Sequence, residues 1–546
     1  MNRLYPKATQ NRLRFGQHGF QRTHAFLRAV LTNFVLLQLL FLGLFCYIFG
    51  SLFQQTQHTH NLTILFVDYD QGAIGRAVRT AYASLASDSF PTLVEQPPSA
   101  YPAPAADVGA AVCATDYWAA LYVAAGASAR LQAALRDSNS TAAQNYNATD
   151  ALFYTWDEAR YPTVGDPAVA GSLQTLADDA RGAYVAADNG SLVPWPLGSP
   201  AAAAVLVNPW TLTATDLQPT PQGSRAIYNT LVIILILIQE FFYLGTINGL
   251  YASFHIYSRI HPARVIAVRT GNSLAYTCVG ALCTVGAIWA FRAGWPVGGA
   301  QFAESWMALW LFAHLNFLTL DVFTVWLPLP YVPMALITWV VVNVTSILLP
   351  FELSPAFYRV GYALPAHNVY QVLLDVWSLG CNRSQLHIAL PVLFAWEVAS
   401  LVLSALGVYR RSHYAALADE AQARELRERV DAALALKETL AEEAATAAAA
   451  DNEEAVATGP SQAAVRAPDA ASRTVTRRDS QALRREVTQA ISRENQQIQR
   501  EQHLAGQLCR FGPSFDLAFG PGADDSRRSS DIDEGDEGPE PVEDRP

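Results

Sequence analysis

The sequence predicts an α-helical polytopic membrane protein with six transmembrane helices, one near the N-terminus and five later. A small α/β or α+β extracytosolic domain is expected between them, and a largely disordered cytosolic tail after them. The first observation is six apolar stretches of about 20 residues, the length that crosses a ~30 Å hydrocarbon core. The second is the long polar segment 51–226 after the first stretch. The third is a bias of positive charge around the stretches.

The apolar stretches define the predicted domain boundaries. The predicted spans are 29–50, 227–250, 270–291, 305–326, 331–350 and 387–409. They divide the chain into a basic tail (1–28), the first helix, a soluble domain (51–226), a five-helix domain (227–409) with an outer loop (351–386), and a C-terminal tail (410–546). The first stretch is too long for a signal-peptide core, and no Ala-x-Ala cleavage site follows it. We therefore expect it to remain as an anchor.

Positive charge predicts the orientation, although the chain as a whole carries a net charge of −11. The tail 1–28 has basic residues and no acid, and loop 251–269 contains three arginines and no acid. Arg410 and Arg411 follow the last span. Because cytosolic loops are enriched in Lys and Arg, both termini are expected in the cytosol.

Glycosylation motifs agree with that orientation. Asn-x-Ser/Thr sequons outside the predicted spans fall only in the two segments expected to face away from the cytosol, at Asn61, Asn139, Asn147, Asn189 and Asn382. These asparagines are therefore glycosylation candidates. Together with the charge bias they predict the plasma membrane or another secretory-pathway membrane.

Two cysteines, Cys113 and Cys381, lie in the segments predicted to be extracytosolic. A disulfide between them and two unpaired thiols both remain open at this stage. The chain has no CxxC pair and no Cys/His cluster with metal spacing, so no metal site is predicted.

The soluble segment contains two strand–helix patterns, which favour an α/β or α+β domain. Residues 61–68 read as a buried strand and 74–86 as a helix; 108–112 and 119–123 read as strands, followed by a helix at 127–136. A further helix is expected at 167–187, and the Pro-rich stretches 91–104 and 193–221 are expected to be loops or linkers.

We find no catalytic constellation, so an enzyme is not expected. Asp68 ends the first strand, and Asp70 is expected to cap the next helix. The chain has only two lysines, Lys7 and Lys437, and neither lies in a phosphate-binding loop. No basic patch is interleaved with aromatics, which argues against nucleic acid, and no cofactor is predicted. ATP-driven transport would need a motor from another chain; ion coupling and no transport at all are the alternatives.

Polar side chains inside predicted spans are functional candidates because they are expensive at bilayer depth. They are Gln239, Glu240, His314, Asp321 and Glu397. Interhelical hydrogen bonding is the competing interpretation, and Asp321, near a span end, is expected to snorkel. Loop 351–386 is rich in apolar residues, which predicts re-entrant or interfacial helices with a turn at 364–368.

The C-terminal tail divides in two. Residues 412–452 are rich in Ala, Glu, Arg and Leu and should be helical, whereas later residues have the composition of a disordered segment. Ser480 and Ser530 each end an Arg-Arg-x-Ser motif. Such motifs are favoured by basophilic kinases, so a kinase is an expected partner.

Several local strings resemble the fungal nitrosoguanidine-resistance (SNG) family of membrane proteins. The strings are Val67–Gly72, Asp116–Tyr122, Tyr154–Arg160, Asn208–Trp210, Asp216–Pro219, Gln239–Phe242, Leu353–Phe357 and Leu364–Asn368. That family looks similar in layout to type-2 ABC exporter permeases, which also carry a soluble insert after the first of six helices. The resemblance implies roles in toxicant resistance and in the lipid organisation of the plasma membrane.

Two functions are therefore expected. The first is an exporter-like permease, as a homodimer, that moves organic toxicants or membrane lipids without its own ATPase. The second is a non-transporting regulator or scaffold of lipid asymmetry and trafficking, in which the tail matters more than the bundle.

Overall fold

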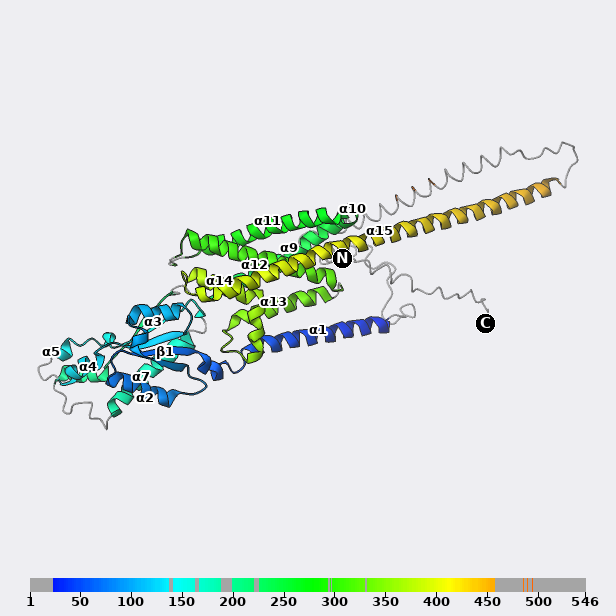
Figure 1. Cartoon of the computed structure of the whole chain (residues 1–546). Helices are drawn as coiled ribbons and strands as arrows, with labels where there is room; N and C mark the ends of the chain where they lie inside the picture. The colour runs from blue at the N-terminus through cyan, green and yellow to red at the C-terminus, as the bar shows by residue number, and fades with distance from the viewer. Residues whose placement is uncertain are drawn as a thin grey trace, which may run out of the picture. The chain divides into compact units, whose positions relative to one another are not determined.

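The computed structural model describes residues 23–456 except 137–140, 163–165, 188–198, 220–224, 293–294, 296 and 329–330, together with residues 485, 489 and 493. Figure 1 shows the helices and strands of the chain with their labels. The described residues form two compact units. The first contains an α/β domain and the helical segments that pack with it. The second contains residues Phe242–Asn272 and the part of the last helix that begins at Val402.

The long apolar helices make the chain a helical membrane protein, as predicted. Among the described residues, five helices are long and apolar enough to cross a membrane, and α13, with 17 residues, is a shorter apolar helix at the fifth predicted span. The helices outside the α/β domain are α1 (Thr23–Ser51), α9 (Arg225–Ser253), α10 (Ile256–Arg259), α11 (Pro262–Ala290), α12 (Gly299–Trp326), α13 (Val332–Leu348), η7 (Ala356–Ala363), α14 (Pro365–Trp377) and α15 (Arg383–Val456).

Segment 51–226 forms the predicted α/β domain, built on one five-stranded mixed sheet. The strand order is β2-β1-β3-β4-β5, and only the β3–β4 pair is antiparallel. The strands are β1 (Thr63–Asp68), β2 (Thr92–Gln96), β3 (Ala119–Val123), β4 (Leu152–Trp156) and β5 (Leu212–Asp216). The helices are α2 (Ala73–Leu85), α3 (Pro104–Cys113), α4 (Ala127–Arg136), α5 (Thr141–Gln144), α7 (Gly171–Ala186) and α8 (Pro200–Val207), with short turns η1 (Gln55–Asn61), η2 (Pro98–Ala100), η3 (Ala148–Asp150) and η4 (Asp166–Ala170).

Helices cover both faces of this sheet (Figure 1). Ile64 and Phe66 of β1 point into a core with α2, α4 and α7, whereas the alternate residues Leu65 and Val67 pack with α3. The period-2 alternation of a strand sends successive side chains to opposite faces. A strand that is apolar at every position is therefore the expected choice for the middle of a sheet covered on both sides.

Three secondary-structure predictions in this domain were wrong. Residues 108–112 belong to helix α3, which Pro104 begins at its first position and which buries Val108, Ala111 and Val112 at helical spacing. The predicted loop 91–104 contains the edge strand β2, and the predicted linker 193–221 contains α8 and β5. Short strands are held by pairing with distant partners, which local composition does not reveal.

Residues 351–386 are bound to the α/β domain. A disulfide joins Cys113 at the end of α3 to Cys381, just before α15. The Tyr370 hydroxyl of α14 donates to the backbone carbonyl of Arg160 at 2.8 Å, and the Asn61 amide donates to the backbone carbonyl of Glu352 at 2.9 Å. The domain and this outer segment therefore form one packed body.

The predicted turn at 364–368 is instead the start of α14. Leu364 is its N-cap residue and Pro365 its first helical residue, a position where the missing amide hydrogen of proline is no loss. The segment 351–386 does contain helices, η7 and α14, as predicted.

The last span and the proximal tail are one continuous helix. Helix α15 runs without interruption from Arg383 to Val456, so the predicted helix at 412–452 has no separate beginning (Figure 1). The predicted disordered region and the two predicted phosphorylation sites, Ser480 and Ser530, lie outside the described residues.

Candidate functional site

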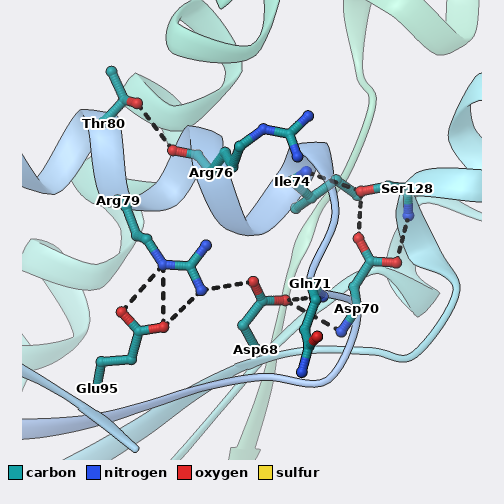
Figure 2. A network of polar contacts seen from close by, with 9 residues as sticks. All are labelled: Asp68, Asp70, Gln71, Ile74, Arg76, Arg79, Thr80, Glu95 and Ser128. Atoms are coloured by element: carbon teal, nitrogen blue, oxygen red, sulfur yellow. Dashed lines mark hydrogen bonds and ion pairs between the residues drawn. The ribbon is translucent and has the colours of Figure 1, made fainter. Parts of the chain in front are cut away.

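One polar network lies where β1 ends and α2 begins (Figure 2). The Asp68 side chain is buried; its Oδ1 accepts from the backbone N–H of Asp70 at 3.1 Å and of Gln71 at 2.8 Å. Its Oδ2 accepts from Arg79 Nη2 at 2.8 Å, and the same guanidinium group also binds Glu95. Both Asp68 oxygens are thus occupied by groups of the domain itself.

Asp70 does not cap α2, contrary to prediction. Its carboxylate accepts from the backbone N–H and from the hydroxyl of Ser128, the second residue of α4 (Figure 2). The Ser128 hydroxyl oxygen in turn accepts from the backbone N–H of Ile74 in the first turn of α2 at 2.9 Å. A residue 54 positions away therefore satisfies the free amide at this helix start, and Asp70 orients it. We therefore interpret this network as structural bracing: it stabilises the contact between the start of α2 and α4.

Asp68→Ala should therefore destabilise the protein. The change leaves two backbone amides without their acceptor and removes one of the two carboxylates that Arg79 binds, at a cost of about 2–3 kcal/mol. Thermal unfolding of the purified full chain measures this loss. Asp88→Ala, at an 86% exposed side chain, is the control and should leave the unfolding midpoint unchanged. Equal midpoints for both variants would contradict a bracing role.

A second polar chain links three membrane helices. Ser273 Oγ of α11 lies 3.1 Å from Nε2 of His314 in α12, and His314 Nδ1 lies 2.6 Å from Oε1 of Glu397 in α15. Ser273 is 0% exposed and His314 3% exposed. The remaining oxygen, Glu397 Oε2, is buried and has no hydrogen-bond partner among the described residues.

This connectivity is that of a serine–histidine–acid triad, but its setting favours proton exchange over nucleophilic attack. A triad nucleophile needs access to substrate and nearby amide donors for an oxyanion. Ser273 lies inside α11 with no exposed surface, and the backbone amides in the interior of a helix are already used by the helix. What the arrangement offers is a short hydrogen-bonded path for a proton.

Glu240 is the most isolated buried acid among the described residues. It is 1% exposed, and neither carboxylate oxygen has a hydrogen-bond partner in the described structure. It belongs to the inward stripe of α9 that also contains Ile236, Leu237 and Leu244. Its neighbour Gln239 is hydrogen-bonded to Tyr276 of α11, whose hydroxyl lies within electrostatic range of Glu240.

The other predicted intramembrane positions have different surroundings. Asp321 is fully buried, so the expectation that it snorkels out of the protein was wrong. Asn343, expected to serve helix packing, accepts from the backbone N–H of Ala366 at 3.1 Å and donates to the carbonyl of Trp339 at 2.9 Å, joining α13 to α14. His367 of α14 is buried, and burial lowers its pKa to about 4, so its ring is neutral near pH 7.

In the second unit, two arginines share the same polar partners. Arg269 donates to Asn248 Oδ1 at 2.7 Å and to the Tyr257 hydroxyl at 3.2 Å. Arg411 donates to the Tyr257 hydroxyl at 3.1 Å and to Thr324 Oγ1 at 2.6 Å. Sequence reasoning used both arginines only as markers of orientation. It had no signal for Asn248, Tyr257, Ser273 or Tyr276, which are ordinary helix residues until their neighbours are known.

The predicted glycosylation sites differ in accessibility. Asn147 is exposed, whereas Asn382 is 2% exposed and donates both to the backbone carbonyl and to the side chain of Gln371. Because a glycan attaches to this amide nitrogen, the folded protein does not offer Asn382 for modification. Asn139 and Asn189 lie outside the described residues. Among the residues that the structure describes, no group of three His, Cys, Asp or Glu side chains is placed to bind a metal ion.

Comparison with known protein families assigns the chain to one of them. Residues 33–402 match a family described as a protein of unknown function, DUF3533. The chain belongs to the DUF3533 family. The matched segment runs from α1 into α15, so the family comprises the α/β domain together with the membrane helices described above. No solved structure matches the chain.

Proposed function

We propose that this DUF3533 protein is an exporter-like permease that moves organic toxicants or lipids across its membrane and has no ATPase of its own. The observation that carries the proposal is Glu240, a buried acid in a membrane helix with both carboxylate oxygens unpaired among the described residues. The resemblance to nitrosoguanidine-resistance proteins, and through them to type-2 exporter permeases, points to the same class.

An unpaired buried carboxylate weakens a purely structural bundle. Removing such a group from water without a partner costs several kcal/mol, and a leucine at the same place on α9 would pack without this penalty. A scaffold does not require an unpaired acid within its membrane helices. A permease can use one, because ionisable groups along a pathway bind the cations or protons that cross.

The disulfide supports six crossings and an extracytosolic α/β domain. Cys113 and Cys381 can meet only if segments 51–226 and 351–386 lie on the same side of the membrane, which requires an even number of crossings between them. Helices α9, α11 and α12 alone would give three. Counting α13 gives four; its 17 residues span about 26 Å, close to the ~30 Å hydrocarbon core. An oxidising compartment also favours the bond.

With that topology, both termini lie in the cytosol and the α/β domain lies outside. We place the protein in the plasma membrane or another secretory-pathway membrane, as a homodimer in contact with membrane lipids. The contacts from Tyr370 and Asn61 tie the domain to the outer segment 351–386, where it acts as a gate or a dimer contact. We also propose that a cytosolic kinase modifies the tail.

Glu240→Gln should slow transport while leaving the fold intact. The amide keeps the shape of the side chain but cannot be ionised, so we expect the rate to fall about tenfold, equivalent to ~1.4 kcal/mol. The measurement is movement of a labelled toxicant or lipid by purified full-length protein in vesicles. Glu304→Gln, at an exposed acid of α12, is the matched control and should transport normally. Normal transport by Glu240→Gln would remove this residue from the mechanism.

A regulator or scaffold is the second candidate, favoured by the continuity of α15 from the membrane domain into the tail. Cells that carry the chain without residues 412–546 discriminate between the two. A permease keeps its toxicant tolerance in that truncation and loses it in Glu240→Gln. A scaffold shows the opposite pattern.

A further inference from the structure

We propose that Ser273, His314 and Glu397 form a proton-binding site within the membrane domain and that proton exchange at this site drives transport. The coupling to transport rests on the proposed permease function. The proton site itself rests only on the geometry of the three side chains.

The two hydrogen bonds connect three helices, α11, α12 and α15, through the ring of His314. The contact of 2.6 Å between His314 Nδ1 and Glu397 Oε1 is short, as hydrogen bonds to an ionised carboxylate are, and Ser273 Oγ lies 3.1 Å from Nε2 of the same ring. A proton can therefore pass between the carboxylate and the imidazole without movement of either side chain.

One proton changes the charge of this site. Without it, Glu397 is a carboxylate that accepts from His314 Nδ1–H, while Nε2 accepts from the Ser273 hydroxyl, and the net charge is −1. With it, the site is neutral: Glu397 becomes a carboxylic acid that donates to His314 Nδ1, while the imidazole takes up the incoming proton at Nε2 and donates to the Ser273 oxygen. Glu397 Oε2 is buried without a partner among the described residues.

Other ionisable groups lie on the membrane helices. They are Glu240 of α9, Tyr276 of α11 and Asp321 two turns from His314 on α12, while α13 contributes none. Arg269 lies one turn before Ser273 on α11. On α15, the neighbouring polar contact is a hydroxyl pair, Ser400 with Thr319 at 2.9 Å, which has no group that titrates near neutral pH.

That hydroxyl pair provides the control. Ser400→Ala removes a buried hydrogen bond between α12 and α15 near Glu397 but takes away no titratable group. Glu397→Gln removes the acid and keeps the shape of its side chain. His314→Gln keeps a hydrogen-bonding side chain but cannot carry the proton.

The test is infrared spectroscopy of the purified full-length protein in lipid nanodiscs, titrated between about pH 9 and pH 5. The wild type should show a carboxylic-acid C=O band that grows as the pH falls and shifts in heavy water. Glu397→Gln should lose part of this band, His314→Gln should move the pH at which it grows, and Ser400→Ala should match the wild type. An unchanged band in Glu397→Gln would overturn the proposal.

A second measurement separates this site from the transport function. In vesicles with an internal pH indicator, the wild type should move protons only while it moves the labelled toxicant, and Glu397→Gln should move neither. If the band is lost in Glu397→Gln but no toxicant moves in the wild type, the proton site stands and the permease function fails. Covalent labelling of Ser273 by a fluorophosphonate probe, absent in Ser273→Ala, would replace the proton site with a nucleophile and refute the proposal.

Discussion

Replacing Cys113 and Cys381 together by serine is expected to lower the free energy of unfolding by about 2–4 kcal/mol. The disulfide joins residues 268 positions apart, from the end of α3 to the start of α15. A cross-link over so long a loop restricts the unfolded chain strongly, because the entropy of loop closure grows with loop length. In the folded state it also holds the α/β domain to the helical segment that contains α14. Thermal unfolding of the purified full chain measures the effect.

Free cysteines supply the matched controls for this experiment. Cys46→Ser and Cys283→Ser remove exposed thiols that form no disulfide, so their unfolding midpoints should equal that of the wild type. A reducing agent should lower the wild-type midpoint to that of the double variant and leave the double variant unchanged. The bond plays no stabilising role if wild type and double variant unfold together under oxidising conditions.

Elements with a strong local signal could be predicted from the sequence. The apolar run of β1 and the helical spacing of α2 and α4 gave their positions to within about two residues. The strands β2, β4 and β5 were missed. The edge strands β2 and β5 leave most of their side chains half-exposed or exposed, so neither an apolar run nor strict alternation marks them. Strand β4 does have the apolar and aromatic run Leu152–Trp156, a local signal that the sequence analysis did not use. For β2 and β5, the pairing partners and not the composition make them strands.

The candidate site shows the same limit. Hydropathy marks Glu240, His314 and Glu397 because an ionisable residue in an apolar helix is conspicuous. It does not indicate that His314 and Glu397, 83 positions apart, are hydrogen-bonded, nor that Ser273 completes the chain. Asp70 fails for the same reason, since its position before a helix suggests a cap while its partner Ser128 belongs to a different helix. Contacts between distant segments decide each of these roles.

Trp210 is the clearest example of a residue whose role depends on contacts with distant segments, because it lies in a stretch whose prolines predicted a linker. Its side chain is fully buried, and its indole Nε1 donates to the backbone carbonyl of Ala177 in α7 at 3.1 Å. Its ring packs edge-on against Tyr184 with centroids 5.8 Å apart, and its own carbonyl accepts from Arg181 at 2.9 Å. The chain thus returns through the core between α8 and β5 before it leads to α9.

Trp210→Ala should therefore be among the most destabilising single substitutions in the domain, with a loss of about 3–5 kcal/mol. The substitution leaves a cavity against α7 and removes the indole N–H that donates to the backbone carbonyl of Ala177. Trp210→Phe keeps most of the apolar volume and loses chiefly the hydrogen bond, so its loss should be about 1–2 kcal/mol. Val207→Ala, three residues earlier at an 82% exposed side chain, should have no measurable effect. If Trp210→Ala unfolds at the same temperature as Val207→Ala, the segment 193–221 is a linker after all and β5 is not part of the cooperative core.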